Sequence, residues 1–253
     1  MKRYWLLIRL FLFLLSGGAR TMARLAVLTR IDKDRAGHFL LTRAGEWSRR
    51  AMAKAGARVR VEGLEKIPER GAVLYVANHQ GALDIPILMG HLPGSPAFVA
   101  KKELFRIPVL GYWMRRVGCV ELDRENARAA RQAILEAADR LRGGRRLVLF
   151  PEGTRSRDPE GRMAAFKRGS LKLATAADAV LVPVTVEGSR FLLRERVPVG
   201  FDGEVRVIVG DPIDVSVLDE AERKALPQRV HATIESTLAR HHMGIGAGGP
   251  VAP

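Results

Sequence analysis

The sequence predicts an α/β fold with a mostly parallel central sheet flanked by helices, preceded by a basic and apolar N-terminal segment. Two patterns carry this prediction. From residue 57 onward, short runs rich in β-branched residues alternate with helical segments, which is typical of a parallel sheet with crossover helices. Residues 1–56 differ in composition, so we expect them to form a separate unit. With 253 residues, the chain can bury one large core.

The expected elements follow one another in regular alternation. The segments expected to be strands are residues 58–62, 73–77, 97–100, 117–122, 147–150, 180–186 and 205–209. The helical segments are expected at residues 84–91, 108–116, 125–142, 167–178 and 219–240. The clearest helix is 125–142, because it is rich in Ala, Arg, Leu and Glu and is closed by Gly143 and Gly144.

Composition narrows the classes of function. The fractions of apolar and charged residues are ordinary for a globular protein. The single cysteine, Cys119, excludes an internal disulfide and fits a reducing compartment. Because there is no second cysteine and the six histidines are dispersed, we expect no zinc site, and we expect no cofactor.

The formal net charge of +15 is concentrated at the N-terminus, since residues 1–60 contain fourteen Lys and Arg but only three acidic residues. The apolar run 4–15 lies in the same region, but it is shorter than the about 20 residues of a membrane span, and Arg9 interrupts it. We therefore expect an interfacial anchor, with Trp5 and its apolar neighbours in the acyl boundary and basic side chains on anionic headgroups. A cleaved secretory signal is the alternative, because basic residues precede the apolar run.

Residues 37–56 continue this pattern at helical spacing. Large apolar side chains such as Phe39 and Trp47 are interspersed with basic ones such as Arg43. The segment is either a membrane-associated helix or a solvated basic helix that packs its apolar side on the main domain. We expect three regions, namely N-terminal membrane-associating helices at 1–56, an α/β domain at 57–240 and a flexible tail at 241–253.

The first chemical signal is the segment 78–84 (NHQGALD), which directly follows the apolar run 73–77. His79 should therefore lie at the C-terminal end of a buried strand, where open α/β sheets bind ligands. The loop can fold Asp84 back onto the imidazole, where a carboxylate fixes the tautomer and stabilises the imidazolium as the other nitrogen takes a proton. The structural alternative is a turn with Asp84 as a helix N-cap.

No activated nucleophile accompanies this pair. The sequence has no Gly-x-Ser-x-Gly elbow, and no base is evidently paired with Ser156, Ser170 or Cys119. A covalent acyl-enzyme is therefore not indicated. We favour direct attack on a thioester by an acceptor hydroxyl that His79 activates.

The second chemical signal is the segment 150–156 (FPEGTRS), at the end of another apolar run. Gly153 lets backbone amides approach a ligand, Thr154 offers a hydroxyl, and Arg155 can form a bidentate pair with phosphate. Glu152 is unfavourable beside a phosphate unless it orients Arg155 or accepts from a substrate hydroxyl. The alternative is a solvated turn with an internal Glu–Arg pair. Other basic residues follow expected strand or helix ends and could add charge to the same pocket: Lys101, Lys102, Arg124, Lys167 and Arg168.

These segments, in this order, resemble the motifs of the glycerophospholipid acyltransferase family, and most closely those of the 1-acyl-sn-glycerol-3-phosphate acyltransferases. Segment 78–84 looks like the family's H-x-x-x-x-D motif, and segment 118–124 (GCVELDR) looks like its second motif. Segment 150–156 matches the third, and 182–184 (VPV) the fourth. The similarity extends over about residues 57–215.

The resemblance implies a catalytic role for His79 as the base and for Asp84 as its partner. It implies that the glycerol phosphate of the acceptor is bound by Lys101, Arg124, Glu152, Gly153, Thr154, Arg155 and Lys167. It also implies an N-terminal two-helix membrane-anchoring motif, which fits residues 4–30 and 37–56. We place the protein at an anionic membrane surface, on the cytoplasmic face of the inner membrane.

The reaction that the resemblance implies is transfer of a fatty acyl group from acyl-CoA or acyl-carrier protein. The acceptor would be the 2-hydroxyl of lysophosphatidic acid, and the product would be phosphatidic acid. Gly81 stands where a Ser is frequent in the family, and Glu121 stands where an apolar or aromatic residue is frequent. Another lyso-lipid acceptor, such as a lyso-ornithine lipid, is therefore an alternative. A non-enzymatic basic protein that binds membrane or nucleic acid is disfavoured, because the charge accompanies an apolar segment and no nucleic-acid motif is present.

Overall fold

The computed structural model describes residues 21, 24–31, 33–156, 158, 161–192 and 202–241. Of the expected tail at 241–253, only His241 is described, as the last residue of a helix; residues 242–253 and the apolar run 4–15 lie outside the described residues.

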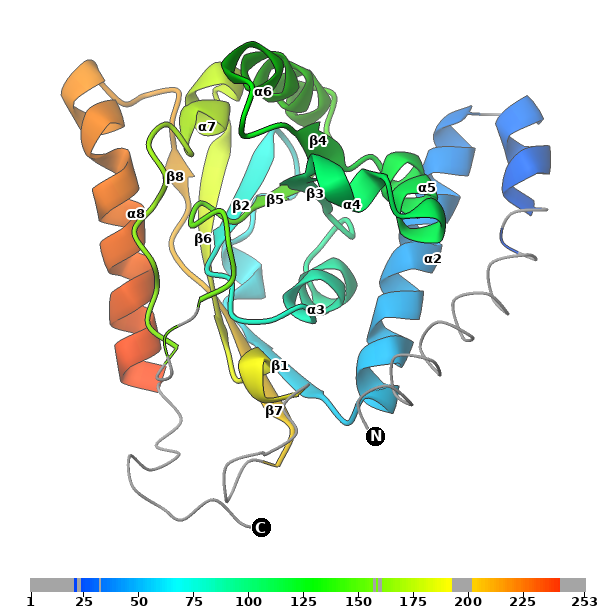
Figure 1. Ribbon diagram of the computed structural model, residues 1–253, viewed down its shortest axis with the longest axis horizontal. Helices are drawn as coiled ribbons and strands as arrows, with labels where there is room; N and C mark the ends of the chain where they lie inside the picture. The colour runs from blue at the N-terminus through cyan, green and yellow to red at the C-terminus, as the bar shows by residue number, and fades with distance from the viewer. Residues whose placement is uncertain are drawn as a thin grey trace.

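The centre of the described fold is an eight-stranded sheet (Figure 1). Its strands are β1 (Arg58–Glu62), β2 (Val73–Ala77), β3 (Ala97–Lys101), β4 (Val120–Leu122), β5 (Leu147–Leu149), β6 (Val180–Glu187), β7 (Glu204–Val209) and β8 (Ile213–Asp214). The spatial order is β1-β7-β6-β2-β5-β3-β4, and β8 also pairs with β6. From β6 to β4 every pairing is parallel, whereas β7 and β8 both run antiparallel to β6. The carboxyl ends of five strands, β2 to β6, therefore meet at one edge of the sheet.

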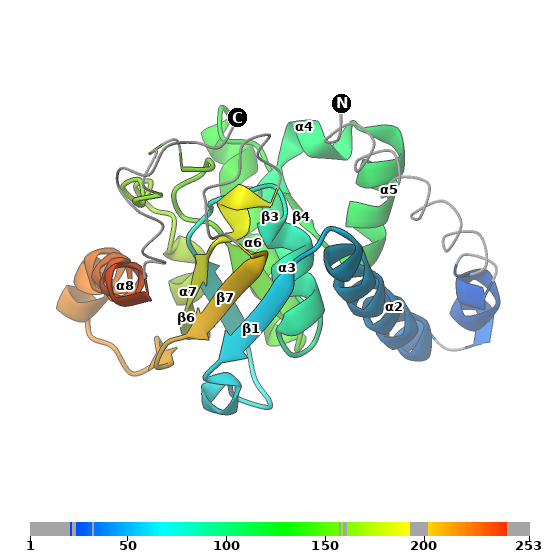
Figure 2. The same ribbon diagram turned by 90° about the horizontal axis from the view of Figure 1, so that it is seen from below.

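Helices cover both faces of this sheet. They are α2 (Lys33–Lys54), α3 (Asp84–His91), α4 (Lys102–Phe105), α5 (Pro108–Val117), α6 (Ala127–Arg142), α7 (Lys172–Ala177) and α8 (Glu220–His241), with 3-10 turns η1 (Leu64–Lys66) and η2 (Ser189–Phe191). Helix α8 packs on one face, against β6, while α3 lies on the opposite side with α2 behind it (Figure 2). Helix α6 packs against α7 and β4.

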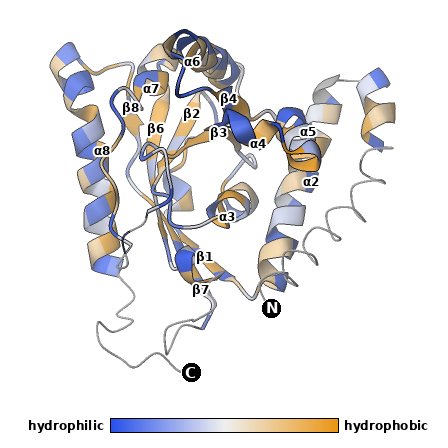
Figure 3. Cartoon of the chain, in the orientation of Figure 1, coloured by the Kyte–Doolittle hydropathy of each residue, from blue (hydrophilic) through white to orange (hydrophobic). Residues whose placement is uncertain are grey.

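The core follows from the sequence of the strands. All five residues of β2 and all three of β5 are buried, so these strands are apolar along their whole length, as expected for a parallel sheet covered on both faces. Figure 3 shows this apolar centre inside more hydrophilic helices. In β1, at the edge of the sheet, exposed and half-buried residues alternate instead. The buried centre of the sheet therefore carries the strand ends that precede His79 and Glu152.

The expected elements are largely confirmed, with two corrections at their boundaries. The strand expected at 117–122 begins only at Val120, because Val117 ends α5 and Gly118 adopts a left-handed conformation (φ 86°) that closes the helix. The helix expected at 167–178 is shorter, since turns precede α7. The short elements α4 and β8 were not predicted.

The N-terminal region is helical where it is described. Residues 24–31 and α2 form helices before the first strand. Leu40 and Met52 of α2 are buried, and α2 packs along α3. This agrees with the interpretation of residues 37–56 as a helix that packs its apolar side on the main domain. In the part of the chain that the structure covers, no helix is both long enough and apolar enough to cross a bilayer.

Candidate active site

The candidate site lies at the edge of the sheet where the carboxyl ends of the parallel strands meet. His79 follows β2, Glu152 follows β5, and Arg124 follows β4. Lys101 ends β3, and Ser189 begins η2 directly after β6. Residues that are separated by up to 110 positions in the sequence are thus assembled by the parallel register of one sheet.

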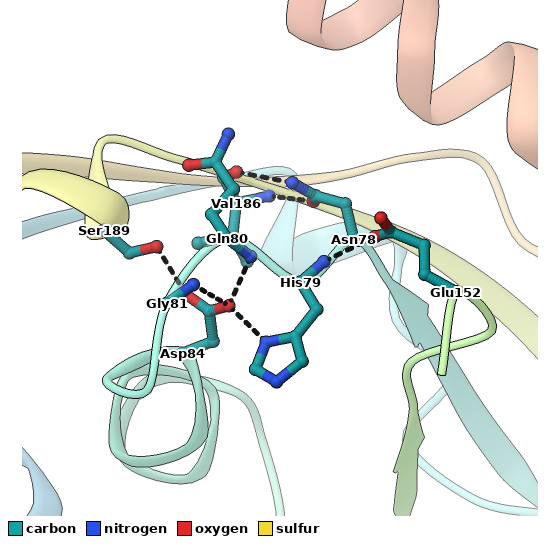
Figure 4. Close-up of polar contacts among 8 residues, drawn as sticks. All are labelled: Asn78, His79, Gln80, Gly81, Asp84, Glu152, Val186 and Ser189. Atoms are coloured by element: carbon teal, nitrogen blue, oxygen red, sulfur yellow. Dashed lines mark hydrogen bonds and ion pairs between the residues drawn. The ribbon is translucent and has the colours of Figure 1, made fainter. Parts of the chain in front are cut away.

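His79 and Asp84 form a direct pair. The Nδ1 atom of His79 lies 2.7 Å from Oδ2 of Asp84, whose side chain is fully buried (Figure 4). The same oxygen accepts hydrogen bonds from the backbone amides of Gln80 (2.8 Å) and Gly81 (2.9 Å). Asp84 is the first residue of α3, and Leu83 occupies the N-cap position without a side-chain cap. The carboxylate therefore orders the loop and the imidazole rather than capping the helix.

The imidazole of His79 is held on its other sides as well. Its ring stacks on Phe150, with ring centroids 4.1 Å apart and planes inclined by 17°. The second ring nitrogen points away from Asp84 (Figure 4), and the side chain keeps 16% of its surface exposed. With Nδ1 facing a carboxylate, the neutral ring carries its proton there, which leaves Nε2 as the basic atom.

Glu152 fixes the backbone of His79. Its Oε1 accepts from the amide of His79 (2.8 Å), and its Oε2 accepts from the amide of Ala164 (2.9 Å). The side chain is 1% exposed, and burial raises the pKa of this carboxyl above its ordinary value. Both oxygens are thus engaged by backbone amides, so neither expected arrangement, orientation of Arg155 or acceptance from a substrate hydroxyl, is needed to explain its presence.

Three further polar residues tie the His79 loop to β6 and η2. The Asn78 side chain donates to the carbonyl of Val186 (2.8 Å) and accepts from its amide (2.7 Å), in the manner of an added strand residue. Gln80 donates to Glu187 (2.8 Å), and the Ser189 hydroxyl donates to Oδ1 of Asp84. The sequence did not predict these roles. Their signal is the presence of polar side chains directly after buried strands, where an unpaired polar group would be costly.

The expected anion site surrounds Gly153. This glycine has a φ of 73°, and its carbonyl accepts a hydrogen bond from Arg124. A Cβ atom here would lie 3.3 Å from Lys167 Cγ and 3.4 Å from Arg124 Nη1, so a side chain would crowd both basic residues. Arg124 and Lys167, 43 positions apart in the sequence, therefore flank one exposed loop.

The other residues expected to bind the acceptor lie around this loop. Thr154 and Arg155 are exposed in it, and the amide of the next residue, Ser156, donates to the carbonyl of His79 (2.7 Å). Lys101 pairs with Glu103 (3.4 Å), whose negative charge also acts on Arg124. The structure thus brings Lys101, Arg124 and Lys167 to the same edge as His79.

Two of the other basic residues differ in their surroundings. Lys102 binds Asp123 (2.8 Å), a contact that joins the ends of β3 and β4, while Arg168 is exposed. Within the described ranges, no group of three or more His, Cys, Asp or Glu side chains could hold a metal ion.

A sheet edge that carries a His–Asp pair beside a basic loop, with no nucleophile elbow, is the arrangement expected of an acyltransferase. Residues 58–187, about half of the chain, match the family model described as Acyltransferase. The chain therefore belongs to the acyltransferase family, and the resemblance found in its sequence is confirmed.

Relatives and a solved structure agree with this assignment. The chain is 31% identical over 185 residues to the 1-acyl-sn-glycerol-3-phosphate acyltransferase of Borreliella burgdorferi, covering 73% of each chain. It is 35% identical over 168 residues to 1-acyl-sn-glycerol-3-phosphate acyltransferase LPAT1, chloroplastic, of Arabidopsis thaliana, covering 64% of this chain and 45% of the relative. The chain thus spans less than half of that chloroplast protein. The crystal structure of the 1-acyl-sn-glycerophosphate (LPA) acyltransferase PlsC from Thermotoga maritima is similar, with a TM-score of 0.75, 29% identity, and coverage of 95% of this chain and 97% of that one.

Proposed function

We propose that this protein transfers a fatty acyl group from acyl-CoA or acyl-carrier protein to the 2-hydroxyl of 1-acyl-sn-glycerol-3-phosphate, giving phosphatidic acid. The observation that carries the proposal is the His79–Asp84 pair, whose second ring nitrogen is turned away from the carboxylate at the sheet edge that also bears Arg124 and Lys167. The names of the relatives and of the similar crystal structure support the choice of acceptor.

The reaction would proceed by direct attack. Nε2 of His79 takes the proton of the acceptor hydroxyl while the hydroxyl oxygen bonds to the thioester carbonyl carbon. When the tetrahedral intermediate collapses, the carbon–sulfur bond breaks and the departing thiolate takes the proton from His79. Asp84 keeps Nδ1 protonated and stabilises the imidazolium between the two steps. General-base action of this kind contributes a factor of about 10²–10⁴ in rate.

The basic loop would hold the acceptor phosphate. Arg124 and Lys167 both lie next to Gly153, and Thr154 and Arg155 extend the same loop with a hydroxyl and a guanidinium. Lys101 would add a fourth positive charge from the end of β3. Hydrogen bonds between such cations and a phosphate are stronger than those between neutral groups.

The N-terminal region would bring the enzyme to its lipid substrate. Its excess of basic residues and its apolar run fit an interfacial anchor on an anionic leaflet, which we place on the cytoplasmic face of the inner membrane. The lipid acceptor would then reach the site from the bilayer, and the polar donor would reach it from the cytosol.

The test is an assay of the purified protein with lysophosphatidic acid, in which acyl-CoA and acyl-carrier protein are offered in parallel. The variant His79→Ala should lower turnover by about 10²–10⁴ while leaving the far-UV circular dichroism and vesicle binding unchanged. The matched control is His241→Ala, which removes an imidazole from the end of α8, a helix that carries none of the residues of the candidate site. Near-normal turnover of His79→Ala, or absence of phosphatidic acid with the unaltered protein and both donors, would contradict the proposal.

A further inference from the structure

The carboxylate of Asp84 is bound on both of its oxygens, and the two sets of donors come from different parts of the chain. Oδ2 accepts from His79 Nδ1 and from the amides of Gln80 and Gly81, all within the same short loop. Oδ1 instead accepts from the hydroxyl of Ser189, which is 105 residues away at the start of η2 (Figure 4). Asp84 and Ser189 are 0% and 2% exposed, so water does not compete for this contact.

The position of Ser189 is fixed from several directions. Gly188, with a φ of 90°, turns the chain from β6 into η2. On the preceding side, Glu187 is fully buried and accepts from Gln80 (2.8 Å). On the following side, Arg190 lies 3.8 Å from Glu187. The hydroxyl is therefore held in place by its surroundings before any substrate binds.

The fit between η2 and the His79 loop is close. A Cβ atom on Gly81 would lie 3.2 Å from the carbonyl oxygen of Ser189 and 3.6 Å from Cα of Arg190. This contact leaves little space for a side chain at position 81. The hydroxyl that meets Asp84 comes from Ser189.

We infer that Ser189 is a positioning residue of the reaction, which acts on His79 through Asp84. The inference rests on the proposed function. As the fourth donor, the hydroxyl stops rotation of the carboxylate about its terminal bond and keeps Oδ2 in line with Nδ1. It also draws part of the negative charge of Asp84 away from the imidazole, which sets how readily His79 gives its proton to the departing thiolate.

The experiment compares Ser189→Ala with Ser189→Thr in the full-length protein, with kcat and KM measured for lysophosphatidic acid and for the donor that supports turnover. The alanine variant should lose about tenfold in kcat, the loss expected for a hydrogen bond to a charged group, with both KM values nearly unchanged. Threonine restores the hydroxyl and should restore kcat.

The matched control is Ser48→Ala in α2. Ser48 is as buried as Ser189, at 1% exposed, but its hydroxyl has no hydrogen-bond partner, so this variant should keep the kinetics. An unchanged kcat in Ser189→Ala would overturn the inference, as would equal losses of kcat in the alanine and threonine variants. If instead His79→Ala were also fully active, the proposed function itself would fail, so the two failures are distinguishable.

Discussion

The two sides of the site differ in how their polar groups are satisfied. On the His79 side, the carboxylates of Asp84 and Glu152 are buried, and their oxygens accept hydrogen bonds from within the protein. On the Gly153 side, Arg124 and Lys167 are exposed beside a loop whose glycine allows close approach. On the His79 side the hydrogen bonds are already formed without substrate, whereas the Gly153 side presents positive charge to solvent.

This difference corresponds to two tasks. A general base must be held in one orientation and tautomer before the reaction, because reorganisation during the reaction would add to the barrier. A phosphate-binding loop must exchange water for ligand oxygens, so its cations have to remain accessible. Substitutions on the His79 side should therefore change kcat, and those on the Gly153 side should change the KM for the acceptor.

The largest effect is expected for Asp84→Asn. The amide keeps the size of the side chain but places an NH₂ group or a neutral oxygen against Nδ1 and the two loop amides, so the imidazole loses its fixed tautomer. We expect kcat to fall by about 10²–10⁴, with a much smaller change in the KM for lysophosphatidic acid. Steady-state kinetics measure this directly. A loss confined to KM would show instead that Asp84 contributes to acceptor binding.

An intermediate effect is expected for Arg124→Ala. Removal of a guanidinium beside Gly153 should raise the KM for lysophosphatidic acid about tenfold and change kcat less, because a single charge-assisted contact to phosphate is lost. The control is Arg128→Ala, which removes an equal charge from an exposed position on α6. Equal KM values in the two variants would mean that net charge, rather than position, governs acceptor binding. With an acceptor that lacks a phosphate, the penalty for Arg124→Ala should disappear.

The smallest effect is expected for Glu152→Gln, and it concerns the stability of the folded protein. Burial raises the pKa of Glu152 in the folded state, so the folded protein binds the proton more tightly than the unfolded chain. The contribution of Glu152 to stability is therefore greatest below its ordinary pKa of 4.5 and falls as the pH rises through the raised value. Melting temperatures of both proteins between pH 4 and 8 measure this. The advantage of the unaltered protein over Glu152→Gln should shrink as the pH rises, and an advantage that grows with pH would contradict a raised pKa.

The elements that the sequence predicted best are those with the strongest local signals. The strand β2 and the helix α3 were bounded to the residue, because burial on both faces of the strand and a proline in the first turn of the helix act within a few positions. The boundary near Val117 was misplaced because an apolar residue that ends a helix looks like the start of a strand until Gly118 is seen to close the helix. The antiparallel pairing of β7 and β8 with β6 was not predicted, because it depends on which strands become neighbours.

The chemical groups and the loops that carry them can be read from local spacing, because spacing within a loop decides whether His79 and Asp84 can meet. Which groups gather around that pair depends on the tertiary structure. The parallel register of β2, β5 and β6 brings Glu152 to the backbone of His79 and Ser189 to Asp84, and these contacts join residues 73 and 105 positions apart. Local spacing carries no information about such distances, because they are set by strand order and by burial of the sheet. The sequence therefore placed Glu152 with the substrate, whereas the fold turns both of its oxygens inward.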